Sequence, residues 1–342
     1  MNRENSQSSR ILLLTLIVSV LSVTFFACTT SETEEPTITI AVIPKGSTHI
    51  FWESVHAGAI KASVELGVDI NWVGPEKEDD RQQQIAVVDN QVLNNVSGIV
   101  LAPLDEMALR RPVRDAVRRN IPVIIFDSAL HDSEDIYTSF IATDNRKGGR
   151  IAGREMGKFL GGKGRVVLLR YMEGSASTTN REEGFLESLE EFPEITLVSD
   201  EQYAGATRAQ AQQASENLLL RFKDEQGNLT IDGIFCPNAS STYGMLQALR
   251  RQRQAGKLIF IGFDSDDPLV KGLEQGEIHG LVVQNPFQMG FLGVKVMLDH
   301  LRGVPVEKRI DTGVTFVVKQ DLEKPEIQEL IDPNLEYWLS QK

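Results

Sequence analysis

The segment TITIAVIPKGSTHIFWESVHAGAIKASVELG, residues 37–67, predicts the fold of the chain. It begins with an apolar run typical of a buried strand and continues into an amphipathic stretch. Apolar residues recur there at three- and four-residue spacing, at Val55, Ala59, Ala62 and Leu66. This spacing gives a helix one apolar stripe, so the segment predicts a strand followed directly by a helix.

The same alternation continues to about residue 320. Apolar runs such as SGIVLAP, IPVIIFDS, GRVVLLRYM and KLIFIGFD alternate with amphipathic stretches. Continuous apolar strands separated by such helices indicate parallel sheets covered on both faces. Ten or so strands are more than one such sheet usually holds. We therefore expect an α/β fold with two doubly wound parallel-sheet lobes.

Polar side chains follow most of these predicted strands, and aromatic side chains follow the first. In an open parallel sheet, ligands bind at the carboxyl ends of the strands. Residues Asp127-Ser128, Asn238, Asp264 and Gln284 each come directly after an apolar run, whereas Phe51-Trp52 follow the first run and a short loop. Two large rings at a strand-to-helix corner are costly to leave in water, so the pattern favours a binding site.

Composition limits the classes of protein. The chain has 342 residues, 41% hydrophobic and 24% charged, with a formal net charge of −13. An acidic surface repels phosphate backbones, so no nucleic-acid partner is expected. Of the two cysteines, Cys236 lies in the strand-like run GIFCPN and is predicted to be a small core residue.

The N-terminus has the layout of a secretion signal. Arg3 and Arg10 precede the apolar run ILLLTLIVSVLSVTFFAC, and the polar stretch TTSETEEPT follows. This resembles a bacterial lipoprotein signal of residues 1–27, with Cys28 as the lipid attachment site and residues 28–36 as a tether. Phe25 replaces the usual leucine, and an uncleaved membrane anchor is the alternative. Both interpretations place the folded part outside the cytoplasm, anchored to a membrane.

Enzyme signatures are absent from the sequence. It has no Gly-x-Ser-x-Gly elbow, no His-Glu-x-x-His and no phosphate-binding loop, and its five histidines form no spaced pair. The acidic run Asp264-Ser265-Asp266-Asp267 lacks the Gly and later Glu of a calcium loop. We predict a protein that is not an enzyme and that uses no cofactor and no metal.

Taken together, the aromatic pair and the motifs IPVIIFDS, ATDNRKGGRIAG, NREEGF, GIFCPN, IGFD and VVQNPFQMGFLGV resemble periplasmic sugar-binding proteins of the ribose/galactose type. The resemblance covers about residues 37–320. It implies two lobes joined by a three-segment hinge near Thr143, Asn285 and Gly313, with a ligand cleft between them. The lobes would be residues 37–142 with 286–312 and residues 143–285 with 313–320, followed by a C-terminal tail at 321–342.

The resemblance also implies which residues contact ligand. Aromatic faces would pack on the C–H patches of a sugar, while polar groups would satisfy its hydroxyls. The matching positions are His49, Phe51, Trp52, Asp127, Ser128, Asn180, Arg181, Asn238, Asp264 and Gln284. Ribose-type proteins have arginine after the aspartate, where this chain has Ser128, so ribose itself is in doubt while other pentoses, hexoses and polyols remain open.

Structural alternatives exist for several of these residues. Trp52 could be a core residue of its helix, and His49 a turn residue. Asp127 and Asp264 could cap a turn or helix, and Asn238 could cap the helix that follows it. Arg181 could pair with glutamates on its own helix.

By resemblance, the function is that of a substrate-binding lipoprotein of an ABC importer. It would bind a monosaccharide or related polyol by hinge closure and present it, as a monomer, to a membrane permease. The alternative is a sensor of the same fold that delivers a sugar, autoinducer or nucleoside signal to a membrane kinase or chemoreceptor.

Overall fold

The computed structural model describes residues 37–47 and 49–341. The predicted signal, Cys28 and the tether lie outside these residues. From Ile38 onward the chain forms one compact unit with two sheets. Within the described ranges, no helix has the length and apolarity needed to cross a membrane.

The first sheet has six strands in the order β11-β5-β4-β3-β1-β2, and every neighbouring pair is parallel. Its strands are β1 (Thr39–Ile43), β2 (Asp69–Trp72), β3 (Gly98–Leu101), β4 (Val123–Phe126), β5 (Ser139–Ala142) and β11 (Arg309–Asp311). Its helices are α2 (Ile50–Leu66), α3 (Arg81–Leu93), α4 (Arg110–Arg118) and α10 (Pro286–Leu301).

Alternate residues of these strands feed two cores on opposite faces of the sheet. Ile40 and Val42 of β1 pack with α2 and α10, whereas Ala41 and Ile43 pack with α3 and α4. Because successive side chains of a strand point to opposite faces, a sheet buried on both sides needs strands that are apolar throughout. The expected doubly wound lobe is confirmed.

The second sheet repeats this plan in the order β12-β10-β9-β8-β6-β7. Its strands are β6 (Lys163–Leu168), β7 (Glu194–Ser199), β8 (Gly233–Phe235), β9 (Ile259–Phe263), β10 (Gly280–Gln284) and β12 (Val314–Val317). The edge strand β12 is antiparallel to β10, and the other pairs are parallel. Its helices are α5 (Asn145–Phe159), α6 (Ala176–Leu189), α7 (Arg208–Leu220), α8 (Ala239–Arg251) and α9 (Asp267–Glu274).

The chain passes between the two sheets three times. It leaves the first sheet after β5, returns to it after β10, and crosses again between β11 and β12. The three connections are short: residues 143–144, residue 285 and residues 312–313. Three short connections hold the lobes side by side and permit a hinge between them.

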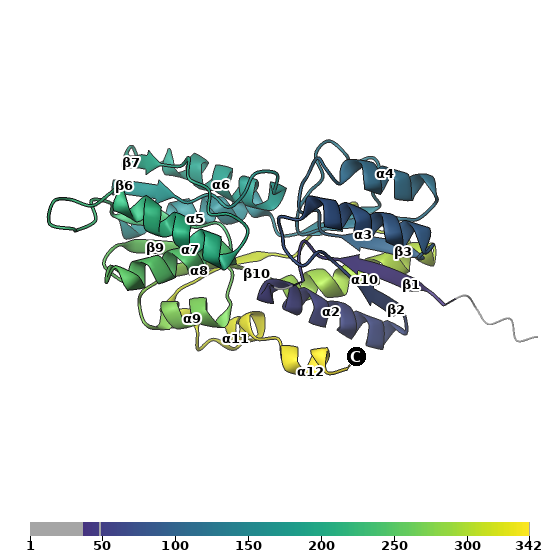
Figure 1. The fold of residues 1–342 in the computed structure, drawn as a ribbon. Helices are drawn as coiled ribbons and strands as arrows, with labels where there is room; N and C mark the ends of the chain where they lie inside the picture. The colour runs from purple at the N-terminus through teal and green to yellow at the C-terminus, as the bar shows by residue number, and fades with distance from the viewer. Residues whose placement is uncertain (1–36, 48, 342) are drawn as a thin grey trace, which may run out of the picture. The chain divides into compact units, whose positions relative to one another are not determined.

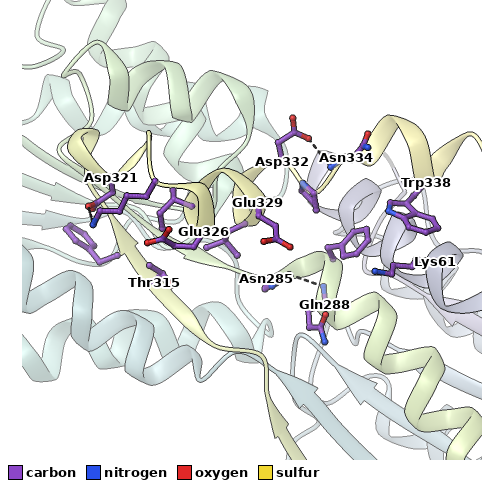
Figure 2. A pocket seen from close by; sticks show the side chains of 16 residues that line it. Lys61, Asn285, Gln288, Thr315, Asp321, Glu326, Glu329, Asp332, Asn334 and Trp338 are labelled. Atoms are coloured by element: carbon purple, nitrogen blue, oxygen red, sulfur yellow. Dashed lines mark hydrogen bonds and ion pairs between the residues drawn. The ribbon is translucent and has the colours of Figure 1, made fainter. Parts of the chain in front are cut away.

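The C-terminal tail contacts both lobes. It contains a short 3-10 helix, Lys319–Asp321, followed by α11 (Pro325–Ile331) and α12 (Leu335–Leu339). Ile327 of α11 is buried in the core of the second lobe, whereas α12 packs against α2 of the first (Figure 1). Figure 2 shows Trp338 of α12 beside Lys61 of α2, whose Nζ lies 5.5 Å from the indole ring. The tail therefore spans the two lobes.

Candidate functional site

A cavity lies between the lobes at the carboxyl ends of the strands. From the first lobe it is lined by Lys45, His49, Phe51, Trp52, Glu78 and Asp127, and from the second by Tyr171, Ser177, Thr178, Arg181, Asn238, Asp264 and Gln284. The structure thus brings together eight of the ten residues predicted from the sequence. The other two, Ser128 and Asn180, lie outside the lining.

Asp127 projects from the end of β4 and forms a buried ion pair. Its backbone is in the left-handed region, with φ of 59°, and its N–H donates to the carbonyl of Ile141 on β5. This conformation turns the carboxylate out of the strand and into the cavity. Lys45 Nζ lies 2.8 Å from Oδ2 of Asp127, and it also donates to Ser177 Oγ of the second lobe at 2.9 Å.

The aromatic pair Phe51-Trp52 opens α2. The two rings meet edge to face with centroids 4.8 Å apart, and Trp52 also packs edge to face on Phe126. Trp52 is only 2% exposed and belongs to the core of the first lobe, yet it lines the cavity as well. Its Nε1 donates to Glu78 Oε1 at 2.5 Å. Trp52 is therefore both a core residue of its helix and part of the cavity wall.

Glu78 also connects the lobes. The hydroxyl of Tyr171, from the second lobe, donates to Glu78 Oε2. Burial, with Glu78 as a second cause, raises the pKa of Tyr171 well above its ordinary value, so the phenol keeps its proton and remains a donor. One carboxylate thus holds the indole of its own lobe and the phenol of the other.

His49 is the N-cap of α2 and lines the cavity beside Phe51. Its Nδ1 accepts the N–H of Phe51 at 3.1 Å. In a neutral imidazole the other nitrogen then carries the proton. Nε2 is buried and has no hydrogen-bond partner within the described part of the chain. It is a donor that a ligand oxygen could satisfy.

Arg181 is buried in the second lobe and is held by uncharged acceptors. Its guanidinium donates to Asn145 Oδ1 at 2.7 Å, to the carbonyl of Pro237 at 2.9 Å and to Gln284 Oε1 at 3.1 Å. It lies 3.9 Å from the ring centroid of Phe263, and burial lowers its pKa.

The alternative partners proposed for Arg181 are engaged elsewhere. Glu182 pairs with Arg170, and both Glu183 and Glu187 pair with Arg146. The guanidinium therefore does not take part in the ion pairs along the outer face of α6, and it presents its positive charge to the cavity.

Asp264 occupies in the second lobe the position that Asp127 has in the first. It follows β9, has φ of 71°, and donates its N–H to the carbonyl of Val282 on β10. Its carboxylate accepts from Gln284 Nε2 at 2.7 Å and from the N–H of Ala239 at 2.9 Å. Burial raises its pKa, and the nearby charge of Arg181 opposes that shift.

Asn238 caps α8 and lines the cavity at the same time. Its Oδ1 accepts the N–H of Ser241 at 3.1 Å, and Ser241 Oγ closes a capping box. Its amide nitrogen donates to Ser240 Oγ at 3.0 Å. A role as helix cap therefore accounts for its side-chain hydrogen bonds.

Ser128 and Asn180 lie outside the cavity lining, and each makes a hydrogen bond within the protein. Ser128 is fully buried, and its Oγ accepts the N–H of Ser177 across the lobes at 3.1 Å. The amide of Asn180 donates to the carbonyl of Ala176 one turn earlier in α6, at 2.8 Å.

Five lining residues were not predicted from the sequence: Lys45, Glu78, Tyr171, Ser177 and Thr178. Lys45 lies within three residues of the end of β1, and Tyr171 within three residues of the end of β6. Their position after a predicted strand is therefore a sequence signal that could have identified both. Glu78 lies in the long loop after β2, where no sequence pattern indicated a role.

The lobes are in contact around this cavity. Glu106 donates its N–H to the carbonyl of Gly174 at 2.9 Å, and Arg81 donates to the carbonyl of Glu173 at 3.2 Å. The space left between the lining side chains is about 30 Å³, which holds one or two waters. A larger ligand must therefore enter with the lobes apart and replace some of these internal hydrogen bonds with its own.

The chemistry of the lining suits a neutral ligand with many hydroxyls. Two cations and three carboxylates lie among hydroxyls and amides, beside the aromatic rings of Phe51, Trp52 and Tyr171. Within residues 37–47 and 49–341, no group of three or more His, Cys, Asp or Glu side chains could hold a metal ion. The arrangement provides paired donors and acceptors for hydroxyl groups and an apolar face for C–H groups.

Comparison with known proteins gives a consistent picture. A family model described as periplasmic binding protein domain matches residues 40–305. The ribose import binding protein RbsB of Haemophilus influenzae is 28% identical over 291 residues, which is 85% of this chain and 94% of that protein. The D-allose-binding periplasmic protein of Escherichia coli is 28% identical over 278 residues, 78% of this chain and 87% of that one.

Solved structures of sugar-binding proteins also resemble this chain. A carbohydrate transporter solute binding protein from Agrobacterium radiobacter, in complex with D-arabinose, is 34% identical, with a TM-score of 0.81 over 86% of this chain and 99% of its own. An ABC transporter solute binding protein from Agrobacterium vitis with bound D-fucose has the same identity, TM-score and coverage.

Proposed function

The chain belongs to the periplasmic binding protein domain family, and on that basis we propose that it binds a monosaccharide or related polyol for an ABC importer. One observation supports this proposal best: Asp127 and Asp264, each at the end of a strand and each from a different lobe, line the same cavity beside Phe51. Sugars are the ligands in the names of similar proteins, which include ribose, D-allose and D-arabinose.

The proposed mechanism is closure of the two lobes on the ligand. The moving bodies would be residues 37–142 with 286–312 and residues 143–285 with 313–320. A sugar bridges the lobes only when they are closed, so it shifts the population toward the closed form. The contacts of Lys45 with Ser177 and of Glu78 with Tyr171 form only in that arrangement and add to its stability.

The remaining parts of the proposal concern location and partners. The protein would be attached to a membrane outside the cytoplasm through lipid on Cys28, would act as a monomer, and would release its ligand unchanged to a membrane permease. The description of similar proteins as periplasmic and as ABC transporter solute binding proteins supports the location and the permease partner, while the lipid attachment rests on the signal-like residues 1–27. Cys236 is fully buried in the second lobe, so it suits a core role and not an attachment site.

A thermal-shift screen tests the proposal. The purified protein is heated with pentoses, hexoses, polyols, nucleosides and amino acids, and any hit is quantified by calorimetric titration. A ligand that binds only the folded state raises the melting temperature in proportion to the logarithm of its concentration. We expect a monosaccharide or polyol to do so. A response to nucleosides or amino acids alone would contradict the sugar assignment.

A further inference from the structure

The C-terminal tail forms the outer wall of a second cavity, next to the sugar site. This cavity has a volume of about 280 Å³ and lies between α2, the end of β9 and the tail. Its apolar lining consists of Ile50, Phe51, Ala239, Pro286, Leu330, Ile331 and Leu335. An apolar cavity of about 150 Å³ is enough to bind benzene, so this one has room for a six-membered ring.

The second cavity adjoins the first. Phe51, Asp264 and Gln284 line both of them. Phe51 is partly buried, and together with Asp264 and Gln284 it forms the wall that the two spaces share. A ligand that occupies the sugar site therefore has free space beside it here, because the sugar cavity itself keeps only about 30 Å³.

The wall opposite the tail offers hydrogen-bond acceptors. It consists of residues 264–267, which include Asp264 and Asp266. Asp266 is fixed in place because it caps α9 and pairs with Arg208. The cavity thus has an apolar side, made by Phe51 and by Leu330, Ile331 and Leu335 of the tail, and an acceptor side at the end of β9, while Asp332 adds one carboxylate from the tail. A ring with an apolar face and hydroxyl groups on one edge matches both sides.

The tail is held in place at both ends. Ile327 is 6% exposed, and Leu322 and Leu330 pack on the same core of the second lobe. At the other end Trp338 lies over Lys61 on the first lobe, with Asp332 and Asn334 between the two helices of the tail (Figure 2). The apolar wall is therefore complete only when the lobes and the tail come together.

From these observations we propose that the second cavity is a subsite for a ring linked to the bound sugar. The ligand class is a glycoside or disaccharide, with one sugar ring between Asp127 and Asp264 and the second ring against Leu335 and Phe51. This inference rests on the proposed sugar-binding function. It adds that the tail takes part in ligand recognition.

The test compares ligands within one sugar series. For the sugar found by the thermal-shift screen, calorimetry measures the free sugar, both methyl glycosides, both phenyl glycosides and disaccharides that carry this sugar at the non-reducing end. We expect one phenyl glycoside or disaccharide to bind at least about fivefold more tightly than the methyl glycoside of the same anomer. Phenyl glycosides probe the apolar side alone, whereas disaccharides also probe the acceptor side.

Variants of the tail separate recognition from general closure. Leu335→Ala removes part of the apolar wall, and Leu339→Ala, one turn further along α12 and outside the lining, is the matched control. The quantity to compare is the affinity for the best phenyl glycoside or disaccharide divided by the affinity for the methyl glycoside of the same anomer. We expect Leu335→Ala to reduce this ratio about threefold or more and to leave the affinity for the free sugar unchanged. Deletion of residues 333–342 should bring this ratio to about one, and Leu339→Ala should leave the ratio at its wild-type value.

The outcomes are distinct. If the free sugar binds and no second ring improves affinity in the wild-type protein, the subsite is excluded while the sugar-binding function stands. If Leu335→Ala weakens the free sugar and the glycosides by the same factor, the tail acts on closure and not on recognition, and the inference is wrong. If no sugar or glycoside binds, both proposals fall.

Discussion

Asp127 in the first lobe and Asp264 in the second occupy equivalent positions, but their charges are compensated in different ways. Each follows the fourth strand of its lobe in chain order, takes a left-handed conformation and donates its N–H to the next strand. Asp127 is paired with Lys45 at 2.8 Å. In the described part of the chain, Asp264 accepts from the uncharged groups of Gln284 and Ala239 alone, and Arg181 compensates its charge from further away.

This difference shows that the repeated fold determines the position of the carboxylate but does not determine which neighbouring residue compensates its charge. The geometry at the strand end recurs because both sheets have the same strand order. The counter-charge comes from Lys45 in the loop after β1 in one lobe and from Arg181 in α6, the helix after β6, in the other, so it lies at different points of equivalent strand-to-helix segments. We therefore expect the two aspartates to respond differently to substitution and to pH.

The largest expected effect is that of Asp127→Ala. It leaves Lys45 buried without its partner, so the free energy of unfolding should fall by about 3–5 kcal/mol. Sugar affinity should fall by about 2–4 kcal/mol because the charge-assisted bonds to hydroxyls are lost. Asp264→Ala leaves two uncharged donors unpaired and should reduce stability by about 1–3 kcal/mol. Denaturant unfolding and calorimetry measure both quantities.

A second substitution isolates the ion pair. Lys45→Met in the Asp127→Ala background removes the unpaired charge, so stability should largely return while sugar affinity stays low. If Asp264→Ala proves as destabilising as Asp127→Ala, the proposed contrast between the two lobes is wrong.

The next effect concerns how each lobe packs its helices. Gly58 of α2 contacts α10, and a Cβ there would lie 1.9 Å from the carbonyl of Phe287. Gly149 of α5 contacts α6, and a Cβ there would lie 1.9 Å from the carbonyl of Arg181. Each Gly→Ala variant should lower the free energy of unfolding by about 1–3 kcal/mol or more, because backbone must move.

Exposed Lys158 on α5 provides the control, since Lys158→Ala should change stability by less than about 0.5 kcal/mol. Gly149→Ala displaces the helix that carries Arg181, so it should also weaken sugar binding. Wild-type stability in either glycine variant would show that the close approach of the helices is not required.

Sugar affinity should also depend on pH through Asp264. Burial raises its pKa, so protonation begins at a pH above the ordinary range of aspartate and removes a charged acceptor. Affinity should therefore fall as the pH falls through this raised pKa. The contribution of Asp264 to folding has the opposite sign: it is fully present below the unfolded-state pKa and is lost as the pH rises through the raised pKa.

Calorimetric titrations between neutral and mildly acidic pH, with unfolding measured in the same buffers, separate the two effects. Asp264→Asn should bind more weakly at neutral pH and should lack this step in its pH profile. A pH profile identical to that of the wild-type protein would rule out Asp264 as the titrating group.

The smallest effect is expected at Asn180. Although the family resemblance places it among the ligand contacts, its amide is bound to the carbonyl of Ala176 and it lies outside the cavity lining. Asn180→Ala should change sugar affinity by less than about 0.5 kcal/mol. A loss comparable to that in Asp264→Ala would place Asn180 in the binding site after all.

The sequence was sufficient to predict the fold class, because apolar strands and amphipathic helices alternate along nearly the whole chain. Strand-end residues such as Asp127 and Asp264 could be predicted for the same reason: the end of each apolar run marks one edge of a sheet. Contacts across the lobes could not be predicted. Glu78 and Tyr171 are distant in sequence, and their hydrogen bond depends on how the lobes meet.

Residues that have more than one structural role could not be recognised from the sequence either. Trp52 is at once a core side chain, a donor to Glu78 and part of the cavity wall. A local pattern gives one role to each residue, whereas three-dimensional packing allows several. The tail shows the same limit, because no pattern in residues 321–342 indicates that the tail contacts both lobes.

The most direct test of the account is a crystal structure of the protein with the monosaccharide identified by the thermal-shift screen. We predict that the sugar lies between the lobes, that its hydroxyls accept from or donate to side chains of both, and that the carboxylates of Asp127 and Asp264 each lie within hydrogen-bonding distance of it. A sugar bound elsewhere, or held by only one of the two aspartates, would contradict the account.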